Sequence, residues 1–258
     1  MLPSRDTAPE RRGAPLPPIA EPHVAPDEIA ALPADLRMRY AAWLRVTGQH
    51  GAARRVLDII EEDSGETATL LDERAALALA AGDAAAVRAT FERRLANRPA
   101  PSARAAFARA LLELGEMEDA ASIVAELTAN HGELATVRSL AADLALLQGD
   151  LATAHNHASA QLSDDETRIA PRLVLARIAL LGGDIEEARA LLDRALTESD
   201  ALTAAQAASA AALADFLGQS ARAQSLRMRY ARLEAQRAAA LAAEIAEALR
   251  TNTAPSRQ

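Results

Sequence analysis

The sequence contains no cysteine and no lysine. Without cysteine, the chain can form no disulfide, no thiolate metal site and no cysteine nucleophile. Because lysine is absent, all 28 basic side chains are arginines, which excludes Schiff-base chemistry and a phosphate-binding loop of the lysine type. These absences remove several classes of enzyme before any motif is considered.

Aromatic residues are scarce too, with one tryptophan, two tyrosines and three phenylalanines among 258 residues, whereas about a quarter of the chain is alanine. Alanine is the best helix former, while β-sheets favour β-branched and aromatic residues. The formal charge of −8 opposes general binding to nucleic acid or to an anionic membrane, because both require a basic surface. The composition therefore predicts an all-α chain of thin, closely packed helices.

The N-terminal segment, residues 1–33, holds eight of the twelve prolines. It has no apolar run long enough for a signal peptide or a membrane span. We expect residues 1–33 to be a disordered proline-rich tail and, without an export signal, we expect the chain to be cytoplasmic.

Six glycines recur at intervals of 34, 33, 34, 34 and 35 residues, each between two helical patterns. A helix often ends at a residue in the left-handed conformation, which glycine adopts at little cost. An acid follows four of these glycines, where it would face the positive N-terminal end of a second helix. The turn glycines are Gly48, Gly82, Gly115, Gly149, Gly183 and Gly218.

Small residues recur in the same register. Seven residues before each glycine stands an alanine, which would let two helices approach closely, and five residues after it stands alanine or valine. The first series is Ala41, Ala75, Ala108, Ala142, Ala176 and Ala211, and the second is Ala53, Val87, Ala120, Ala154, Ala188 and Ala223.

In this pattern the chain resembles the tetratricopeptide-repeat (TPR) family, whose helix–turn–helix units of about 34 residues have small residues at both positions. Residues 180–188 and Ala195 show the resemblance best, and it covers residues 34–235. It implies a right-handed α-solenoid of about six repeats. We expect first helices near 35–47, 68–81, 102–114, 133–148, 166–181 and 202–217.

The last helix is predicted to be unusually long, because residues 220–250 contain neither proline nor glycine. Leu226, Tyr230 and Leu233, then Leu241 and Ile245, recur at helical spacing, but Arg237 interrupts the stripe. We favour a capping helix that covers the last repeat and then frays, so that residues 236–258 are an extension with a short disordered end. The alternative is a projecting segment that forms a homodimer or docks elsewhere.

By resemblance to TPR arrays, the first helices line a concave groove. Residues three before each turn glycine would project into it, as would charged residues six before. We predict that the leucines anchor an amphipathic helix or peptide and that the charges set its register. The predicted groove residues are Leu79, Leu112, Leu146, Leu180, Arg45, Arg109, Asp143, Arg177 and Asp215. Alternatively, the leucines pack against the neighbouring repeat and the charges pair with each other.

Arginine also recurs eleven residues before the glycine, as Arg37, Arg104, Arg138 and Arg172. An ordered ladder of ion pairs is one interpretation. We expect instead that these arginines are solvated, because exposed ion pairs contribute little to stability.

The sequence has no catalytic constellation. His155 and His157 point to different faces of a helix and cannot share a metal without a third ligand. No glycine-rich phosphate loop or serine elbow occurs. We therefore expect no enzyme, no cofactor and no metal, and predict a scaffold or adaptor that binds a protein or peptide partner. The alternatives are a homo-oligomeric structural protein and an RNA binder of the pentatricopeptide type.

Overall fold

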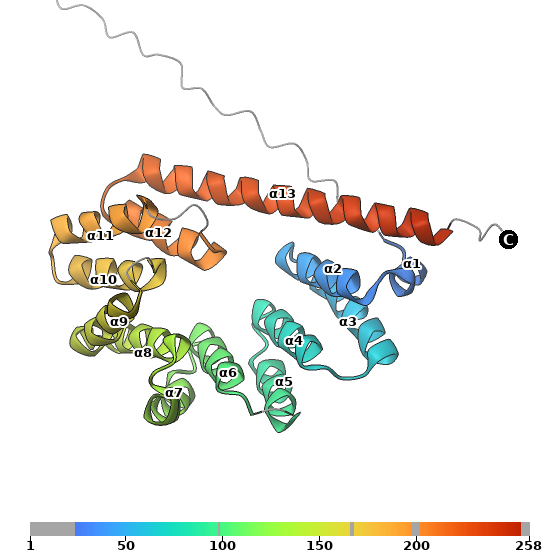
Figure 1. Ribbon diagram of the computed structural model, residues 1–258, viewed down its shortest axis with the longest axis horizontal. Helices are drawn as coiled ribbons and strands as arrows, with labels where there is room; N and C mark the ends of the chain where they lie inside the picture. Colours follow the sequence, from blue (N-terminus) through green and yellow to red (C-terminus); the bar gives the residue numbers. More distant parts are fainter. Residues whose placement is uncertain (1–23, 98, 166–167, 198–201, 254–258) are drawn as a thin grey trace, which may run out of the picture.

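The computed structural model describes residues 24–253, except for residues 98, 166–167 and 198–201. Within these residues the chain forms helices α1 to α13 and no strand. Figure 1 shows that α2 to α12 follow one another around an arc, and that α13 runs back across the opening of the arc. The expected all-α solenoid of six helix pairs is therefore confirmed.

The first helix of each pair lies on the inner side of the arc (Figure 1). These helices are α2 (Ala34–Val46), α4 (Ala68–Ala80), α6 (Pro101–Glu113), α8 (Ala135–Gln148), α10 (Ile169–Leu181) and α12 (Ala204–Phe216). Their bounds confirm the predicted first helices to within three residues. The second helices are α3 (His50–Ser64), α5 (Ala84–Asn97), α7 (Met117–His131), α9 (Leu151–Asp164), α11 (Ile185–Thr197) and α13 (Ser220–Thr253).

All six turn glycines adopt the left-handed conformation that the sequence predicts, with φ between 70° and 83°. At Gly183, its N–H donates to the carbonyl oxygen of Leu180, and the N–H of Asp184 donates to that of Ala179. The same two bonds recur at the other five glycines and satisfy carbonyls at the end of the first helix.

The acid after the glycine caps the second helix in three repeats. The carboxylates of Asp83, Asp150 and Asp184 each accept a hydrogen bond of 3.0 Å from a backbone N–H three residues later. This bond lowers the pKa of Asp150 below its ordinary value. The turn therefore ends one helix and starts the next within two residues.

The small residues on both sides of the turn are buried, as predicted. Each alanine seven residues before the glycine is at most 3% exposed, and each residue five after it is at most 1% exposed. Their size lets the two helices of a repeat pack closely. Larger side chains complete a succession of apolar clusters along the array, one of which joins Leu173, Leu192 and Leu213 of the last repeats.

The N-terminal segment differs from the prediction. Residues 26–31 form a short helix, α1 (Pro26–Ala31), and Val24, Ile29 and Leu32 are at most 7% exposed in a core cluster with the first repeat. The expected disordered tail is thus wrong for residues 24–33. The sequence does not reveal this helix, because three apolar residues among prolines show no helical period. Residues 1–23 lie outside the described part of the chain.

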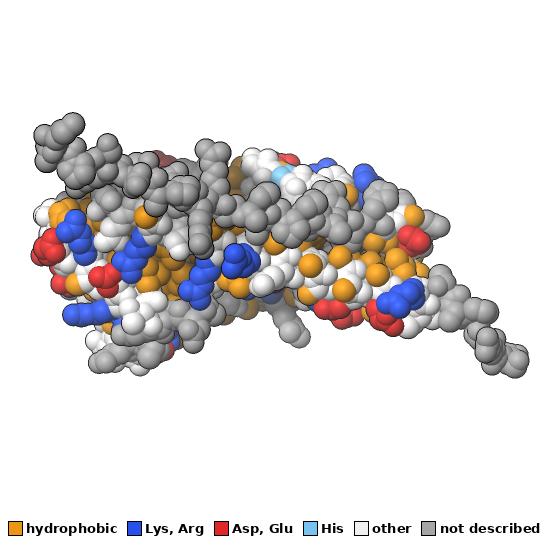
Figure 2. Space-filling model, turned by 90° about the horizontal axis from the view of Figure 1, so that it is seen from above, with side chains coloured by type: hydrophobic (Ala, Val, Ile, Leu, Met, Phe, Trp, Pro, Cys, Tyr) orange, Lys and Arg blue, Asp and Glu red, His pale blue; other side chains and the backbone are white. Residues whose placement is uncertain are grey.

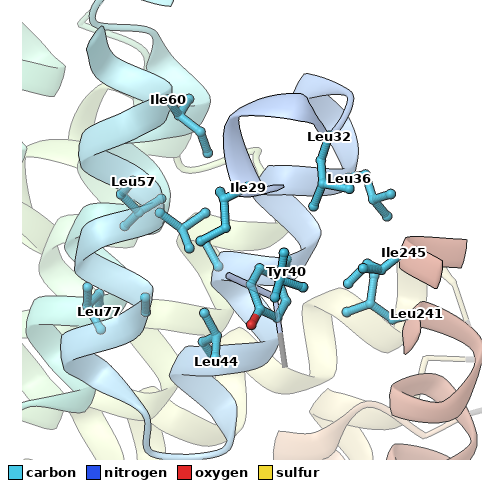
Figure 3. Close-up of a cluster of buried hydrophobic side chains, with 14 of the residues drawn as sticks. Ile29, Leu32, Leu36, Tyr40, Leu44, Leu57, Ile60, Leu77, Leu241 and Ile245 are labelled. Atoms are coloured by element: carbon cyan, nitrogen blue, oxygen red, sulfur yellow. The ribbon is translucent and has the colours of Figure 1, made fainter. Parts of the chain in front are cut away.

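The end of α13 packs on the start of the array. Leu241 and Ile245 of α13 point toward Leu36 and Tyr40 of α2, as Figure 3 shows, and all four are at most 5% exposed. The helix neither frays after residue 235 nor projects from the array. One helix thus covers both α12 and the first repeat, which closes the arc into a ring.

Candidate partner-binding groove

The four predicted groove leucines lie on the inner helices, but they are not freely exposed. Leu146 is 8% exposed and belongs to a core cluster, while Leu79, Leu112 and Leu180 are half-buried against clusters shared with the next helices. Much of each side chain thus contributes to packing between repeats. Only part of its surface faces the groove.

Most of the predicted groove charges are paired. Arg45 donates to Glu73 of the next inner helix over 2.6 Å, and Arg109 donates to Asp143, one repeat later, over 2.9 Å. Asp215 accepts a hydrogen bond of 2.5 Å from Arg227 of α13. Arg177 is exposed and, among the described residues, has no ion-pair partner.

The arginines eleven residues before the glycine have a structural role. Arg37 pairs with Asp63, Arg104 with Glu126 and Arg138 with Asp164, in each case near the end of the second helix of the same repeat. The bond from Arg104 lowers the pKa of Glu126. The expectation of solvated side chains is therefore wrong for Arg37, Arg104 and Arg138, which form ion pairs, and Arg172 is buried, with 8% of its surface exposed.

Two hollows lie along the inner helices of the later repeats. The larger, of about 680 Å³, runs over the first turns of α6, α8 and α10 to α12, and small and polar side chains such as Ser102, Thr136 and Ser139 line it. The smaller, of about 570 Å³, lies between α10 and α12 and is mainly apolar. We call it the α10–α12 hollow, and its lining residues are Arg177, Leu180, Leu181, Ser209, Ala212, Leu213 and Phe216.

The most exposed apolar residues of the α10–α12 hollow stand two positions before the turn glycines. Leu181 is 63% exposed and Phe216 is 77% exposed, and Leu147 at the same position of the preceding repeat is 55% exposed. Sequence reasoning placed the groove three and six residues before the glycine and missed this series. The signal was there, because large apolar residues occupy this position in three consecutive repeats.

The histidines show no metal-binding arrangement. His155 is exposed and His157 is half-buried on α9. Within the described ranges, no three histidine, cysteine, aspartate or glutamate side chains gather closely enough to hold a metal ion. In the same part of the chain, no helix has both the length and the apolar character of a membrane span.

The sequence matches no family model and no curated protein. Its structure does match solved TPR proteins. A TPR protein from Parabacteroides merdae is 16% identical, with a TM-score of 0.58 over 85% of this chain and 84% of that one.

Two further matches are similar in extent. A thermophilic TPR protein from Thermus thermophilus is 22% identical, with a TM-score of 0.54 over 71% of this chain and 99% of the other. PilW, described as a widely conserved type IV pilus biogenesis factor, is 13% identical, with a TM-score of 0.53 over 76% and 91%. The chain therefore has the fold of a TPR solenoid.

Proposed function

We propose that the chain is a non-catalytic scaffold that holds a peptide or helix of a partner protein in its inner groove. The observation that carries this proposal is the α10–α12 hollow, where Leu181 and Phe216 are exposed beside Arg177, which has no ion-pair partner among the residues that the structure describes. An exposed apolar cluster rimmed by polar groups is typical of an interaction site.

The size of the apolar contribution supports a specific site. Full burial of a leucine or phenylalanine side chain is worth about 1.5–3 kcal/mol, so a ligand that covers both Leu181 and Phe216 would lower its dissociation constant about a hundredfold or more. The half-buried Leu180 would extend the apolar contact, and Arg177 would favour a ligand with a carboxylate near its apolar anchor. Arg109 and Asp143 are already paired with each other, so they would fix the position of the ligand along the groove rather than add to its affinity.

A homodimer through the C-terminal helix has less support. Leu241 and Ile245, which suggested it, are already buried within the chain. The function we favour therefore depends on the inner helices.

Selection of displayed random peptides on the purified chain tests this function. Dissociation constants of the enriched peptides would be measured by fluorescence anisotropy for the intact chain and for a Leu181→Asp/Phe216→Asp variant. Both side chains are exposed, so the variant should fold, and we expect it to weaken binding about a hundredfold.

Val46→Asp is the matched control. Val46 is 59% exposed and stands at the same repeat position, two before the turn glycine, at the far end of the array. The control should bind as tightly as the intact chain. If no peptide is enriched, or if the enriched peptides bind the double variant equally well, the proposed function is wrong.

A further inference from the structure

Repeat solenoids are normally held by contacts between neighbouring units only. This chain adds a contact between its two ends. Arg39 of α2 and Glu244 of α13, 205 positions apart, form a two-pronged ion pair in which one of the bonds spans 3.0 Å. We call this ion pair, together with Leu36, Tyr40, Leu241 and Ile245, the closing contact.

The helix α13 is fixed at two separate places. Near its start, Leu226 packs against the core cluster of the last repeats and Arg227 bonds to Asp215 of α12. Near its end lies the closing contact. Between them, Gln236 and Arg237 are exposed, and Arg237 pairs with Glu234 of the same helix rather than with another element. Ala238, one residue further on, is 4% exposed, so only a short exposed stretch separates the two attachments.

The closing contact is the weaker of the two attachments. The side chains of Arg39 and Glu244 are each 49% exposed, and exposed ion pairs contribute little. Its apolar part consists of Leu241 and Ile245, with the half-buried Ala248 and Leu249, packed against α1 and α2. A repeat junction, by contrast, has alanines fully buried on both helices, a shared cluster and a capped turn. Opening of the ring would break the closing contact and leave every repeat junction intact.

We propose that α13 is a releasable strap, which closes the array end to end and controls access to the inner groove. Because the curvature of a solenoid is the sum of small rotations between repeats, its ends can separate without the loss of any junction. In the closed ring, a partner reaches the inner helices only through the two faces of the ring. In the open state it can also enter from the side. The control of access, but not the strap itself, rests on the proposed function.

The strap can be tested without any partner. The chain has no cysteine, so Arg54→Cys on α3 and Ala246→Cys on α13, both exposed, would carry the only two spin labels. Double electron–electron resonance would then report the distance between the ends. We expect one narrow distribution of distances for the doubly labelled chain. When Leu241→Asp/Ile245→Asp is added to it, the distribution should become broader and its mean distance longer.

Ala239→Asp/Ala243→Asp is the matched control, because both alanines are exposed on the same helix with the same spacing. The control should keep the narrow distance. The strap is refuted if Leu241→Asp/Ile245→Asp leaves the distance unchanged, if the background is already broad, or if the narrow distance arises between two copies in a dimer.

A charge swap guards against misfolding of the apolar variant. Glu244→Arg would face Arg39 with a like charge and should shift the population toward the long distance. Arg39→Glu/Glu244→Arg restores an opposite pair and should restore the short one. If Glu244→Arg leaves the short distance unchanged, the ion pair plays no part in closure.

The effect on access is measured separately, with a peptide that the groove binds. If the closed ring holds about nine molecules in ten, Leu241→Asp/Ile245→Asp should tighten the apparent affinity of a partner too large for the closed ring, such as the peptide fused to a folded domain, about tenfold. The free peptide should change less. Equal effects on both would overturn the control of access, while the distance measurements would still stand. If no peptide binds, the proposed function fails and the strap is unaffected.

Discussion

The junction inside each repeat and the closing contact between the two ends are built from different side chains. At a junction, α8 and α9 meet at Ala142 and Ala154, both fully buried, beside a turn with a left-handed glycine. At the closing contact, leucine, isoleucine and tyrosine meet across two helices, and an exposed ion pair borders them. Figure 2 looks onto α13 and shows hydrophobic side chains with a few charged ones on this face, and Ala239, Ala243 and Ala246 of α13 are exposed.

The two kinds of contact respond differently to a change in size or charge. A junction of alanines has no free space, so it tolerates neither a larger side chain nor a change of backbone conformation. The closing contact consists of larger buried side chains bordered by a half-exposed ion pair, and it joins two elements far apart in the sequence, so they can separate while each repeat stays packed. We therefore expect global unfolding from changes at junctions and opening of the ring from changes at the closing contact.

The largest effect is expected from Ala142→Leu. Ala142 is 0% exposed between α8 and α9, so the three added carbons must displace a neighbouring helix, at a cost of about 3 kcal/mol in the free energy of unfolding. Urea denaturation followed by circular dichroism would measure it. Ala152→Leu, an exposed position on α9 of the same repeat, should change stability by less than about 0.5 kcal/mol. Equal effects would mean that the junction is not closely packed.

The features of the junction could be predicted because they recur. Turn glycines and buried alanines repeat at nearly constant spacing, and each copy supports the interpretation of the others. The partners of Arg37, Arg104 and Arg138 were missed because they lie 22 to 26 residues further on at a spacing that varies, so no fixed period reveals them.

The closing contact could not be predicted for a related reason. Leu241 and Ile245 form an apolar stripe on a helix, and a stripe indicates that something covers it but not what. Its partner, the face of Leu36 and Tyr40, lies about 200 residues earlier and occurs only once. The inner position of the first helices agrees with the prediction, and the exposed residues Leu181 and Phe216 lie one position beyond the predicted ladder of leucines.

A smaller effect on the free energy of unfolding is expected in the turn of the fifth repeat, where substitutions at two adjacent glycines should change it in opposite directions. Gly183 has a φ of 83°, which strains any residue with a Cβ, so Gly183→Ala should destabilise the chain by about 1 kcal/mol. Gly182 has a φ of −77°, and an added Cβ would meet the carbonyl oxygens of Ile178 and Ala179 at 3.4 and 3.5 Å.

Gly182→Ala should therefore be tolerated and should stabilise the chain by about 0.5 kcal/mol, because alanine lowers the entropy of the unfolded state. Thermal unfolding of the two variants side by side would measure the difference. The same sign for both would contradict the assignment of Gly183 as the residue that turns the chain.

The smallest effect is expected from the ion pair of the closing contact, as a dependence on pH. Hydrogen bonds from Arg39 lower the pKa of Glu244, and the same bonds raise the pKa of Arg39. A carboxylate whose pKa is lowered in the folded state favours that state above its unfolded pKa, about 4.3, and this contribution is lost as the pH falls through the folded value. The charge of Asp35 also raises the pKa of Arg39.

Comparison with Glu244→Gln isolates the contribution of this carboxylate. Near pH 7 the intact chain should populate the short distance a few-fold more than the variant does, because both side chains of the pair are half exposed and the pair is weak. At a pH below the folded pKa of Glu244 the two proteins should become alike, while circular dichroism still shows folded repeats. Identical distance distributions near neutral pH would show that the apolar side chains alone close the ring. The closing contact would then differ from the repeat junctions in the size and packing of its side chains, and not in its charges.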